Sequence, residues 1–352
     1  MSQMDVKSAF LNDPLEEEVY IIHPPIFEKE GRKHLVYRLR KALYGLQQAP
    51  RAWNKLIDAL LAKLGFVKYT VEFGVYVKRT SHANTLIVCL YVDDLIITRS
   101  VEEEIEEFKG RMKIEFEMTD LGTLSYFLGL EFVHTHRGVF LHQKKYAQEI
   151  LKRFKMEGCN DAAVSVLPGL KLTKEKEAEV VDGTLYKQIV GSLRFLCNSR
   201  ANLSFGVGLI SRFMHDPRTP HMAAAKHILR YLKGTTDWGI FFPKADEQNE
   251  IVLEAFSDSD WCGEKVGRRS TYGYLFKYLD APISWCSKKQ KFVALSSCEA
   301  EYIAASEAAC QSLWLEVVLE ELKLDYRKPV QLNIDNKSAI NLSKKSYSTR
   351  EK

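Results

Sequence analysis

The chain has 352 residues, 46% of them apolar and 27% charged, which is typical of folded globular protein with room for two or three domains. Its 50 Lys and Arg residues against 46 acidic residues give a formal charge of +4, which permits a nucleic-acid partner without requiring one. No apolar run approaches the ~18 residues of a membrane helix, and the N-terminus has no apolar signal-peptide core. We therefore expect no membrane partner.

The seven cysteines are odd in number, widely spread and without a CxxC pair. This spacing argues against a zinc ribbon and predicts a reduced, intracellular setting, in a cytoplasmic particle or the nucleus.

Residues 1–155 alternate apolar segments with short helical ones. The run LIVCLYV before Asp93 is β-branched and aromatic, and LIIT follows Asp94 at once, which predicts a hairpin with both acids at its tip. A lone Asp pair in a turn is ordinarily turn chemistry. Two like charges at one buried tip, however, favour a bound cation, and Asp5 in another strand-like segment offers a third carboxylate.

The remaining elements are predicted from apolar periodicity and from turn residues. In chain order we first expect a helix over VEEEIEEFKGRMKIEF with an acidic solvated face, and then a linker over residues 156–185. Helices are expected over 186–240, with HMAAAKHILRYLKGT the clearest. Strands are expected from about Ile251, followed by an Ala-rich helix over 298–322 and by a strand and a helix in VQLNIDNKSAI.

Four segments, MDVKSAFLN, KALYGLQQAPRAW, LYVDDLIIT and LGTLSYFLGLEF, resemble in order the reverse transcriptase motifs of copia-type retrotransposon polyproteins. The resemblance implies that Asp5, Asp93 and Asp94 hold two Mg²⁺ (or Mn²⁺) ions for nucleotidyl transfer. It also implies deoxynucleotides, an RNA template and a DNA primer as partners.

The same resemblance gives roles to residues around these acids. Phe10 would exclude a ribose 2′-hydroxyl. Tyr44, Gly45, Gln48 and Pro50 would pack against nucleotide and template, and Phe127, Leu128 and Gly129 would hold the primer end. The alternatives are that Phe10, Tyr44 and Trp53 are core residues and that Gly45 and Pro50 are turn and cap residues.

The helical region resembles the connection that follows in this family. Its basic residues, which are Arg212, Lys226, Arg230 and Lys233, either contact phosphate or form the solvated face of amphipathic helices. His215 and His221 are expected at helix starts, since no further ligand completes a metal set.

From Glu254 onward, AFSDSDWCG, RRSTYGYLF, SKKQ, SSCEAEYIAA and LNIDNKSAI resemble a copia-type ribonuclease H domain, which implies two metal ions and an RNA–DNA hybrid as substrate. The resemblance assigns Asp258, Glu301 and Asp335 as its first three acids. Asp260 and Glu299 lie two residues along the same elements, so their side chains are expected to point elsewhere.

The expected fold is therefore α+β or α/β. It comprises a truncated reverse transcriptase palm with the start of the thumb over 1–155, a linker and helical connection over 156–250, and a ribonuclease H-like mixed sheet over 251–352. In the family, fingers precede the first catalytic Asp and a fourth ribonuclease H acid follows the last motif. Four residues precede Asp5 and the sequence stops at SYSTREK, so we expect neither here. The alternative is a retroelement remnant that keeps the fold and weak nucleic-acid binding without catalysis.

Overall fold

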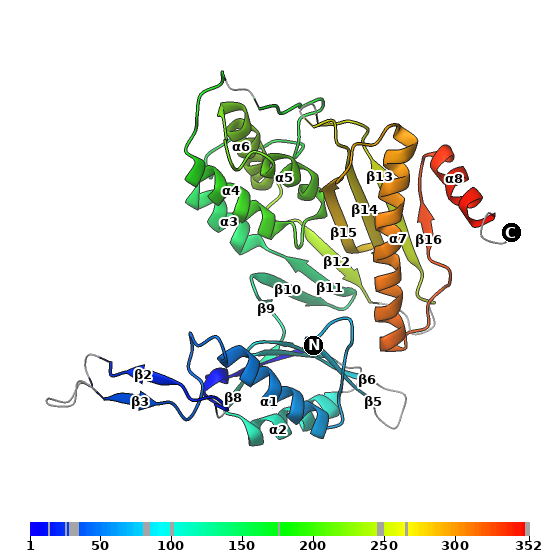
Figure 1. Ribbon diagram of the computed structural model, residues 1–352. Helices are drawn as coiled ribbons and strands as arrows, with labels where there is room; N and C mark the ends of the chain where they lie inside the picture. The colour runs from blue at the N-terminus through cyan, green and yellow to red at the C-terminus, as the bar shows by residue number, and fades with distance from the viewer. Residues whose placement is uncertain are drawn as a thin grey trace. The chain divides into compact units, whose positions relative to one another are not determined.

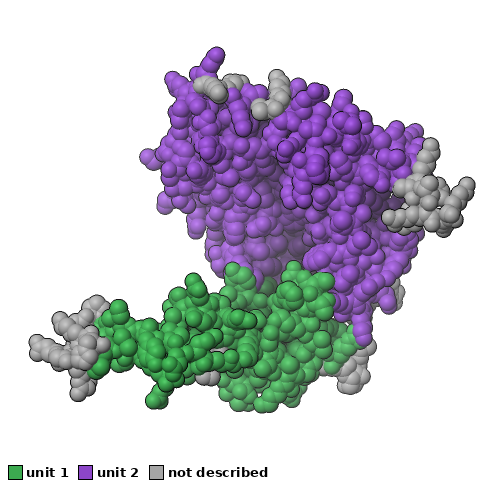
Figure 2. Space-filling view, viewed as in Figure 1, with its two compact units in different colours: residues 1–124 green, residues 125–352 purple. Residues whose placement is uncertain are grey.

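A computed structural model of the chain describes residues 1–12, 15–24, 27, 35–79, 85–98, 102–174, 177–244, 250–264 and 267–348. It forms two compact units, Met1–Leu124 and Ser125–Lys352, coloured separately in Figure 2. In the described part of the chain, no helix is both long and apolar enough to cross a membrane.

The first unit is a six-stranded sheet with the order β4-β5-β6-β7-β1-β8 and two helices, beside a separate two-stranded ribbon of β2 and β3 (Figure 1). Its elements are β1 (Ser2–Val6), η1 (Ala9–Leu11), β2 (Tyr20–Ile22), β3 (Val36–Arg38), α1 (Ala49–Lys63), β4 (Val67–Lys68), β5 (Val75–Arg79), β6 (Thr85–Tyr91), β7 (Asp94–Thr98), α2 (Glu102–Glu115) and β8 (Met118–Thr123).

The core of the first unit lies between the sheet and both helices. Alternation along β6 and β7 buries Val88 and Ile97, which join Met4 of β1 in one cluster with apolar residues of α1 and α2. The helix predicted over 101–116 is confirmed as α2, with its acids on the solvated face; Val101 lies outside the described residues. Burial of this one sheet face fixes the register that brings the acids of β1 and β7 together.

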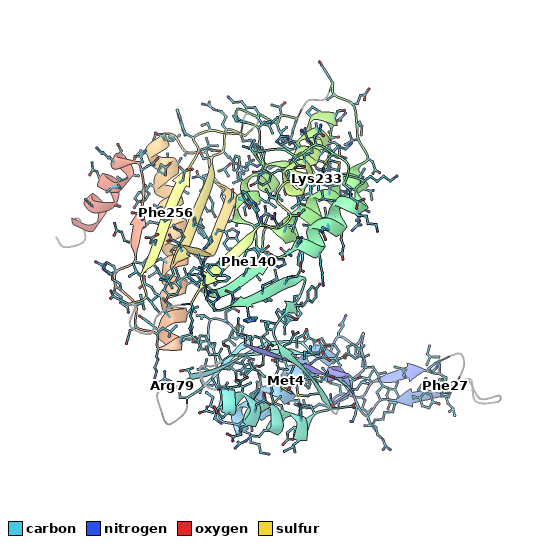
Figure 3. All side chains as sticks on the ribbon, turned by 180° about the vertical axis from the view of Figure 1, so that it is seen from behind. Met4, Phe27, Arg79, Phe140, Lys233 and Phe256 are labelled. Atoms are coloured by element: carbon cyan, nitrogen blue, oxygen red, sulfur yellow. The ribbon has the colours of Figure 1, made fainter. Side chains whose placement is uncertain are left out.

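The second unit begins with a four-stranded sheet of order β12-β11-β10-β9 and a group of helices. Its elements are β9 (Tyr126–Phe127), β10 (Leu130–Thr135), β11 (Gly138–His142), α3 (Lys144–Arg153), α4 (Gly183–Leu196), η3 (Ala201–Leu203), α5 (Ser204–Ser211), α6 (Thr219–Lys233) and β12 (Gly239–Pro243). Apolar residues of α3 to α6 form one buried cluster. In Figure 3, Phe140 marks β11 and Lys233 the end of α6.

A second four-stranded sheet, of order β15-β14-β13-β16, completes this unit. Its elements are β13 (Leu253–Ser259), β14 (Thr271–Tyr278), β15 (Ala281–Lys289), α7 (Ser297–Leu322), β16 (Gln331–Asn333) and α8 (Lys337–Ser348). The strand β16 runs parallel to β13, whereas β14 is antiparallel to both of its neighbours. Leu315 of α7 packs on Leu253, Ala255 and Phe276, so α7 covers one face of the sheet (Figure 1).

The structure confirms the helices predicted in HMAAAKHILRYLKGT and over 298–322, as α6 and α7, and the strand and helix of VQLNIDNKSAI, as β16 and α8. It differs at one place. The helical prediction over 186–240 ends in a strand, since β12 starts at Gly239 and pairs with β11, about a hundred residues earlier. This pairing is also why residues after Leu124 join the second unit. The finer domain boundaries at 155/156 and 250/251 stay a prediction.

Candidate metal centres and nucleic-acid contacts

In the first unit, Asp5, Asp93 and Asp94 lie at adjacent positions of neighbouring strands. Asp5 of β1 is the Cα partner of Asp94 of β7, and Asp93 lies in the two-residue turn between β6 and β7. Burial, followed by the charges of Asp93 and Asp94, raises the pKa of Asp5 above its ordinary value. Negative charge is therefore crowded at this hairpin tip.

The tip is fixed from two sides. The indole Nε1 of Trp53 donates to the carbonyl of Val92 at 2.6 Å, and the amide of Val6 donates to the carbonyl of Asp93 at 2.8 Å. Val92 has φ +56°, a left-handed conformation that strains a β-branched residue and that is found mostly at functional sites. Trp53 is only 2% exposed, which supports the alternative that it is a core residue.

Gln3 is a contact of this site that the sequence analysis missed. Its side chain is buried, and its Nε2 donates to Oδ1 of Asp94 at 3.0 Å. The signal was a polar residue two positions before Asp5, which puts both side chains on the same face of the strand.

Two of the predicted nucleotide-binding residues lie beside the acids. The Phe10 and Tyr44 rings are 4.7 Å apart. Burial, then the charges of Asp93 and Asp5, raises the pKa of Tyr44. Tyr44 is 55% exposed, so it is not a core residue, whereas Phe10 is half-buried against the core.

Gly45, Gln48 and Pro50 shape the chain that enters α1. Gly45 has φ +94°, Gln48 is the N-cap residue and Pro50 lies in the first turn, as the turn-and-cap alternative predicts. In the described part of the chain, no hydrogen bond joins Gln48 or Pro50 to the three aspartates.

Phe127, Leu128 and Gly129 form the β9–β10 hairpin of the second unit. Phe127 pairs with Leu130, and Leu128 and Gly129 have φ +48° and +81°, as a tight type I′ turn requires. A Cβ at Gly129 would lie 3.0 Å from the Phe195 ring, so a larger residue there would require that ring to shift, in addition to the strain of the positive φ. The role of this hairpin at a primer end stays a prediction.

In the second unit, Asp258, Glu301 and Asp335 converge from β13, α7 and the turn after β16. One carboxylate oxygen from each lies within 4.8 Å of the others. Among the described residues this is the one group of three or more His, Cys, Asp or Glu side chains that is arranged to hold a metal ion. Three separate elements thus supply the oxygen ligands that a Mg²⁺ or Mn²⁺ ion prefers.

Glu301 is the buried member of this group, at 5% exposure. Its Oε1 accepts from the Ser259 amide at 3.1 Å, while its Oε2 is buried and has no hydrogen-bond partner among the described residues. Burial, then the charges of Asp258 and Asp335, raises the pKa of Glu301. A buried carboxylate oxygen without a partner is costly, and a divalent cation between the three acids would satisfy it, so the residues fit a metal.

The two neighbouring acids have other partners. Oδ1 of Asp260 accepts from the amides of Thr271 at 2.8 Å and Gly263 at 3.3 Å. Oε2 of Glu299 accepts from the Leu295 amide, at the start of α7. These bonds hold local backbone, and neither carboxylate belongs to the group of three acids.

A second contact that the sequence analysis missed is Gln290, at the end of the SKKQ segment. It is 2% exposed, and its Nε2 donates to Ser259 Oγ at 3.2 Å and to the Ala300 carbonyl at 2.9 Å. Ser259 and Ala300 directly follow and precede Asp258 and Glu301. Gln290 therefore ties β13 to the first turn of α7, which only the tertiary contacts reveal.

The basic residues of the helical region divide into two groups. Arg230 donates to the Asn160 carbonyl at 2.8 Å, and Lys233 bonds the Cys159 carbonyl, so both hold the segment before α4. Arg212 donates to Thr271 Oγ1 at 2.8 Å, while Lys226 is exposed. His221 lies at the start of α6, where its ring accepts from the Arg218 amide, as expected; His215 lies in the turn before α6.

Comparison with known proteins identifies the class of the N-terminal half. The family described as "Reverse transcriptase (RNA-dependent DNA polymerase)" matches residues 1–168. A structure of the foamy viral protease-reverse transcriptase in complex with double-stranded DNA is 13% identical and covers 94% of this chain and 50% of that chain, with a TM-score of 0.23. That score is too low to support an argument about the fold.

Three curated relatives extend the comparison to the whole chain. The Pol polyprotein of transposon TNT 1-94 from Nicotiana tabacum is 40% identical over 100% of this chain and 27% of its own length. That of transposon RE1 from Arabidopsis thaliana is 37% identical over 97% of this chain and 23% of its length. A putative Ty5-1 transposon protein of Saccharomyces cerevisiae is 32% identical over 88% of this chain and 100% of its length.

The chain therefore belongs to the copia-type retrotransposon Pol family, and its N-terminal half matches the reverse transcriptase region. It spans about a quarter of the length of the first two relatives.

Proposed function

We propose that this chain performs the two reactions of a retrotransposon polymerase. RNA-directed DNA synthesis takes place at Asp5, Asp93 and Asp94, with an RNA template, a DNA primer and deoxynucleotides. Hydrolysis of RNA in an RNA–DNA hybrid takes place at Asp258, Glu301 and Asp335. The observation that carries the proposal is the convergence of the second group within 4.8 Å; membership of the reverse transcriptase family supports the first.

Each group of acids would hold two Mg²⁺ (or Mn²⁺) ions. The chemistry such ions supply is charge stabilisation on the attacking and leaving oxygens of an in-line displacement at phosphorus. The protein holds the acids in position. Glu301 is fixed by the Ser259 amide, and the β1–β7 register keeps Asp5 opposite Asp94, so little reorganisation is needed when ligands bind.

Around the polymerase acids, Phe10 and Tyr44 would contact the incoming nucleotide. Their rings pack on each other, and the charges of Asp93 and Asp5 raise the pKa of Tyr44. Phe10 in that position would discriminate against a ribose 2′-hydroxyl by steric exclusion. Gly45, Gln48 and Pro50 would act by shaping the entry to α1, and the Phe127–Gly129 hairpin by holding the primer end.

The experiment measures both activities in one purified chain. Primer extension on an RNA template and release of labelled RNA from a hybrid are followed with Mg²⁺. The Asp93→Asn/Asp94→Asn variant is expected to lower extension by about 10²–10³-fold and to leave hydrolysis unchanged, and Asp258→Asn to do the reverse.

If neither activity exceeds its Asn control in protein that still melts cooperatively, the catalytic proposal is wrong. The chain would then be a remnant that keeps the fold and nucleic-acid affinity. Loss of both activities in either variant would instead show that the two groups do not work separately.

A further inference from the structure

Gln290, the residue after β15, places a buried amide between the end of β13 and the start of α7. It is 2% exposed. Its Nε2 donates to Ser259 Oγ at 3.2 Å and to the Ala300 carbonyl at 2.9 Å, and its backbone amide donates to the Ser270 carbonyl at 2.8 Å. Since a carbonyl can only accept, the nitrogen of the Gln290 side chain, and not its oxygen, must face Ala300.

One half of this amide is unfavourable for the fold. Oε1 of Gln290 is buried and has no hydrogen-bond partner within the described residues, which costs stability that an apolar side chain of similar length would not cost. The favourable half is the pair of bonds from Nε2, and both end beside an acid of the cluster. Ser259 follows Asp258, and Ala300 precedes Glu301. The Ser259 amide also donates to Oε1 of Glu301 at 3.1 Å.

Apolar packing fixes this end of α7 only weakly. The buried apolar residues around Glu301 on the helix are Ala300 and Ala304, whose methyl groups bury little apolar surface. The large buried apolar side chain of α7 is Leu315, which follows Glu301 by 14 residues, or about 21 Å along the helix axis. Polar contacts therefore decide where the Glu301 carboxylate lies relative to β13.

The relative position of β13 and α7 matters because the acids are shared between them. Oxygens of Asp258, Glu301 and Asp335 lie within 4.8 Å of one another. Mg²⁺ requires near-ideal octahedral geometry with bonds of about 2.0–2.1 Å, whereas Ca²⁺ accepts flexible geometry at about 2.3–2.6 Å. A small movement of α7 away from β13 would therefore weaken binding of Mg²⁺ more than binding of Ca²⁺.

We propose that Gln290 is a positioning residue that holds the start of α7 on β13 and thereby makes the three acids selective for Mg²⁺ over Ca²⁺. The side chain acts through Ser259 and Ala300. This inference rests on the proposed metal-dependent hydrolysis and adds the residue that sets the cation preference of that site.

Cation binding tests the proposal without any need for catalysis. Mg²⁺ and Ca²⁺ affinities are measured by titration calorimetry in the full chain with Asp93→Asn/Asp94→Asn, so that the acids of the first unit do not contribute. Adding Gln290→Met, which keeps the length of the side chain but not the amide, is expected to weaken Mg²⁺ binding roughly tenfold and Ca²⁺ binding by less than about threefold. Adding Asp258→Asn instead identifies the part of the affinity that belongs to the cluster.

The matched control is Gln143→Met. Gln143 lies in the same unit, is also 2% exposed, and accepts from the Ser199 hydroxyl at 2.7 Å, so its replacement also removes a buried amide bonded to a serine. We expect thermal melts to show a loss of stability in this control and calorimetry to show both cation affinities unchanged. A second variant, Ser259→Ala, removes one acceptor of the Gln290 amide and should change the ratio of Mg²⁺ to Ca²⁺ affinity in the same direction as Gln290→Met.

Hydrolysis gives an independent measurement. In the otherwise unchanged protein, Gln290→Met should raise the Mg²⁺ concentration for half-maximal hydrolysis of an RNA–DNA hybrid roughly tenfold, and saturating Mg²⁺ should restore most of the rate. A rate that stays low at saturating Mg²⁺, or an equal change of affinity for both cations, would overturn the inference. The same holds if Gln143→Met shifts the cation preference as Gln290→Met does.

Failure of the proposed hydrolysis has a different signature. In that case the parent chain does not cut the hybrid at any Mg²⁺ concentration, while calorimetry still shows the selective loss of Mg²⁺ affinity in Gln290→Met. If Asp258→Asn leaves the Mg²⁺ affinity of the parent unchanged, the acids do not hold the cation, and the inference is wrong together with the metal centre.

Discussion

Glu301 is a residue of the acidic cluster that we expect to destabilise the metal-free fold. It is a nearly buried carboxylate with one oxygen unpaired among the described residues and two further acids beside it. We expect Glu301→Gln to raise the unfolding free energy of the metal-free protein, on the order of 1 kcal/mol, while abolishing hydrolysis. Chemical denaturation and the hybrid assay measure the two effects. A variant less stable than the parent would show that the charge is satisfied in the fold.

The difference in unfolding free energy between Glu301→Gln and the parent should depend on pH, and the sign of this dependence follows from the pKa of Glu301. Burial and the neighbouring acids raise the pKa of Glu301 above its ordinary 4.5, so the folded chain binds this proton more tightly than the unfolded chain does. Protonation therefore stabilises the fold as pH falls through the raised pKa. The advantage of Glu301→Gln should be largest near neutral pH and shrink on acidification. A gap that widens towards low pH would contradict this cause.

At the scale of elements, the start of α7 decides where Glu301 lies. Ser296 Oγ accepts from the Glu299 amide, one of the free amides of the first helical turn. The Glu299 carboxylate accepts in turn from the amide of Leu295, the residue before the N-cap. Ser296→Ala should cost about 1 kcal/mol of stability and lower hydrolysis further than that loss explains. Ser296→Asp, which keeps a capping oxygen, is the control. Thermal melts measure the stability of both variants, and the hybrid assay measures their hydrolysis rates. Equal hydrolysis rates in the two variants would show that the cap does not position Glu301.

The β6–β7 hairpin depends in the same way on α1. Trp53→Phe keeps an aromatic ring but removes the bond to the Val92 carbonyl, a group that is then unpaired at a cost of about 1–3 kcal/mol. We expect primer extension to fall more than hydrolysis in that variant. Phe116→Leu is matched to it, since Phe116 packs on Trp53 with ring centroids 5.1 Å apart and its side chain has no group that could bond to the turn. Equal losses of primer extension in both variants would show that Trp53 acts through packing alone.

For the whole molecule, two units with separate cores predict two unfolding steps. Leu193 is fully buried in the helical cluster of the second unit, so Leu193→Ala should cost about 2–5 kcal/mol. That change should lower one transition by roughly 2–4 °C per kcal/mol and leave the other in place. Ile57→Ala, in the core of the first unit, should shift the other transition. Calorimetry of both variants decides this, and a single transition that moves in both would show one cooperative unit.

The sequence by itself determined the family and most of the local structure. Apolar alternation around Asp93, the helical period of α2 and the Ala-rich α7 are local signals, because each element buries one face of its own segment. For Glu299 the helical period predicts a direction different from that of Glu301, since two residues along a helix turn the side chain by about half a circle.

Only the tertiary structure decided what depends on pairing between distant segments. The strand β12 was not predicted, because its partner β11 is far away in sequence and so short a strand does not show a period. The contacts of Gln3 and Gln290 were missed for the same reason, since each bonds residues of another element. Likewise, the sequence supplied the three acids of the second unit separately. The sheet order β15-β14-β13-β16 brings Asp335, after β16, close to Asp258 of β13, because lateral neighbours in a sheet are set by strand pairing and not by sequence distance.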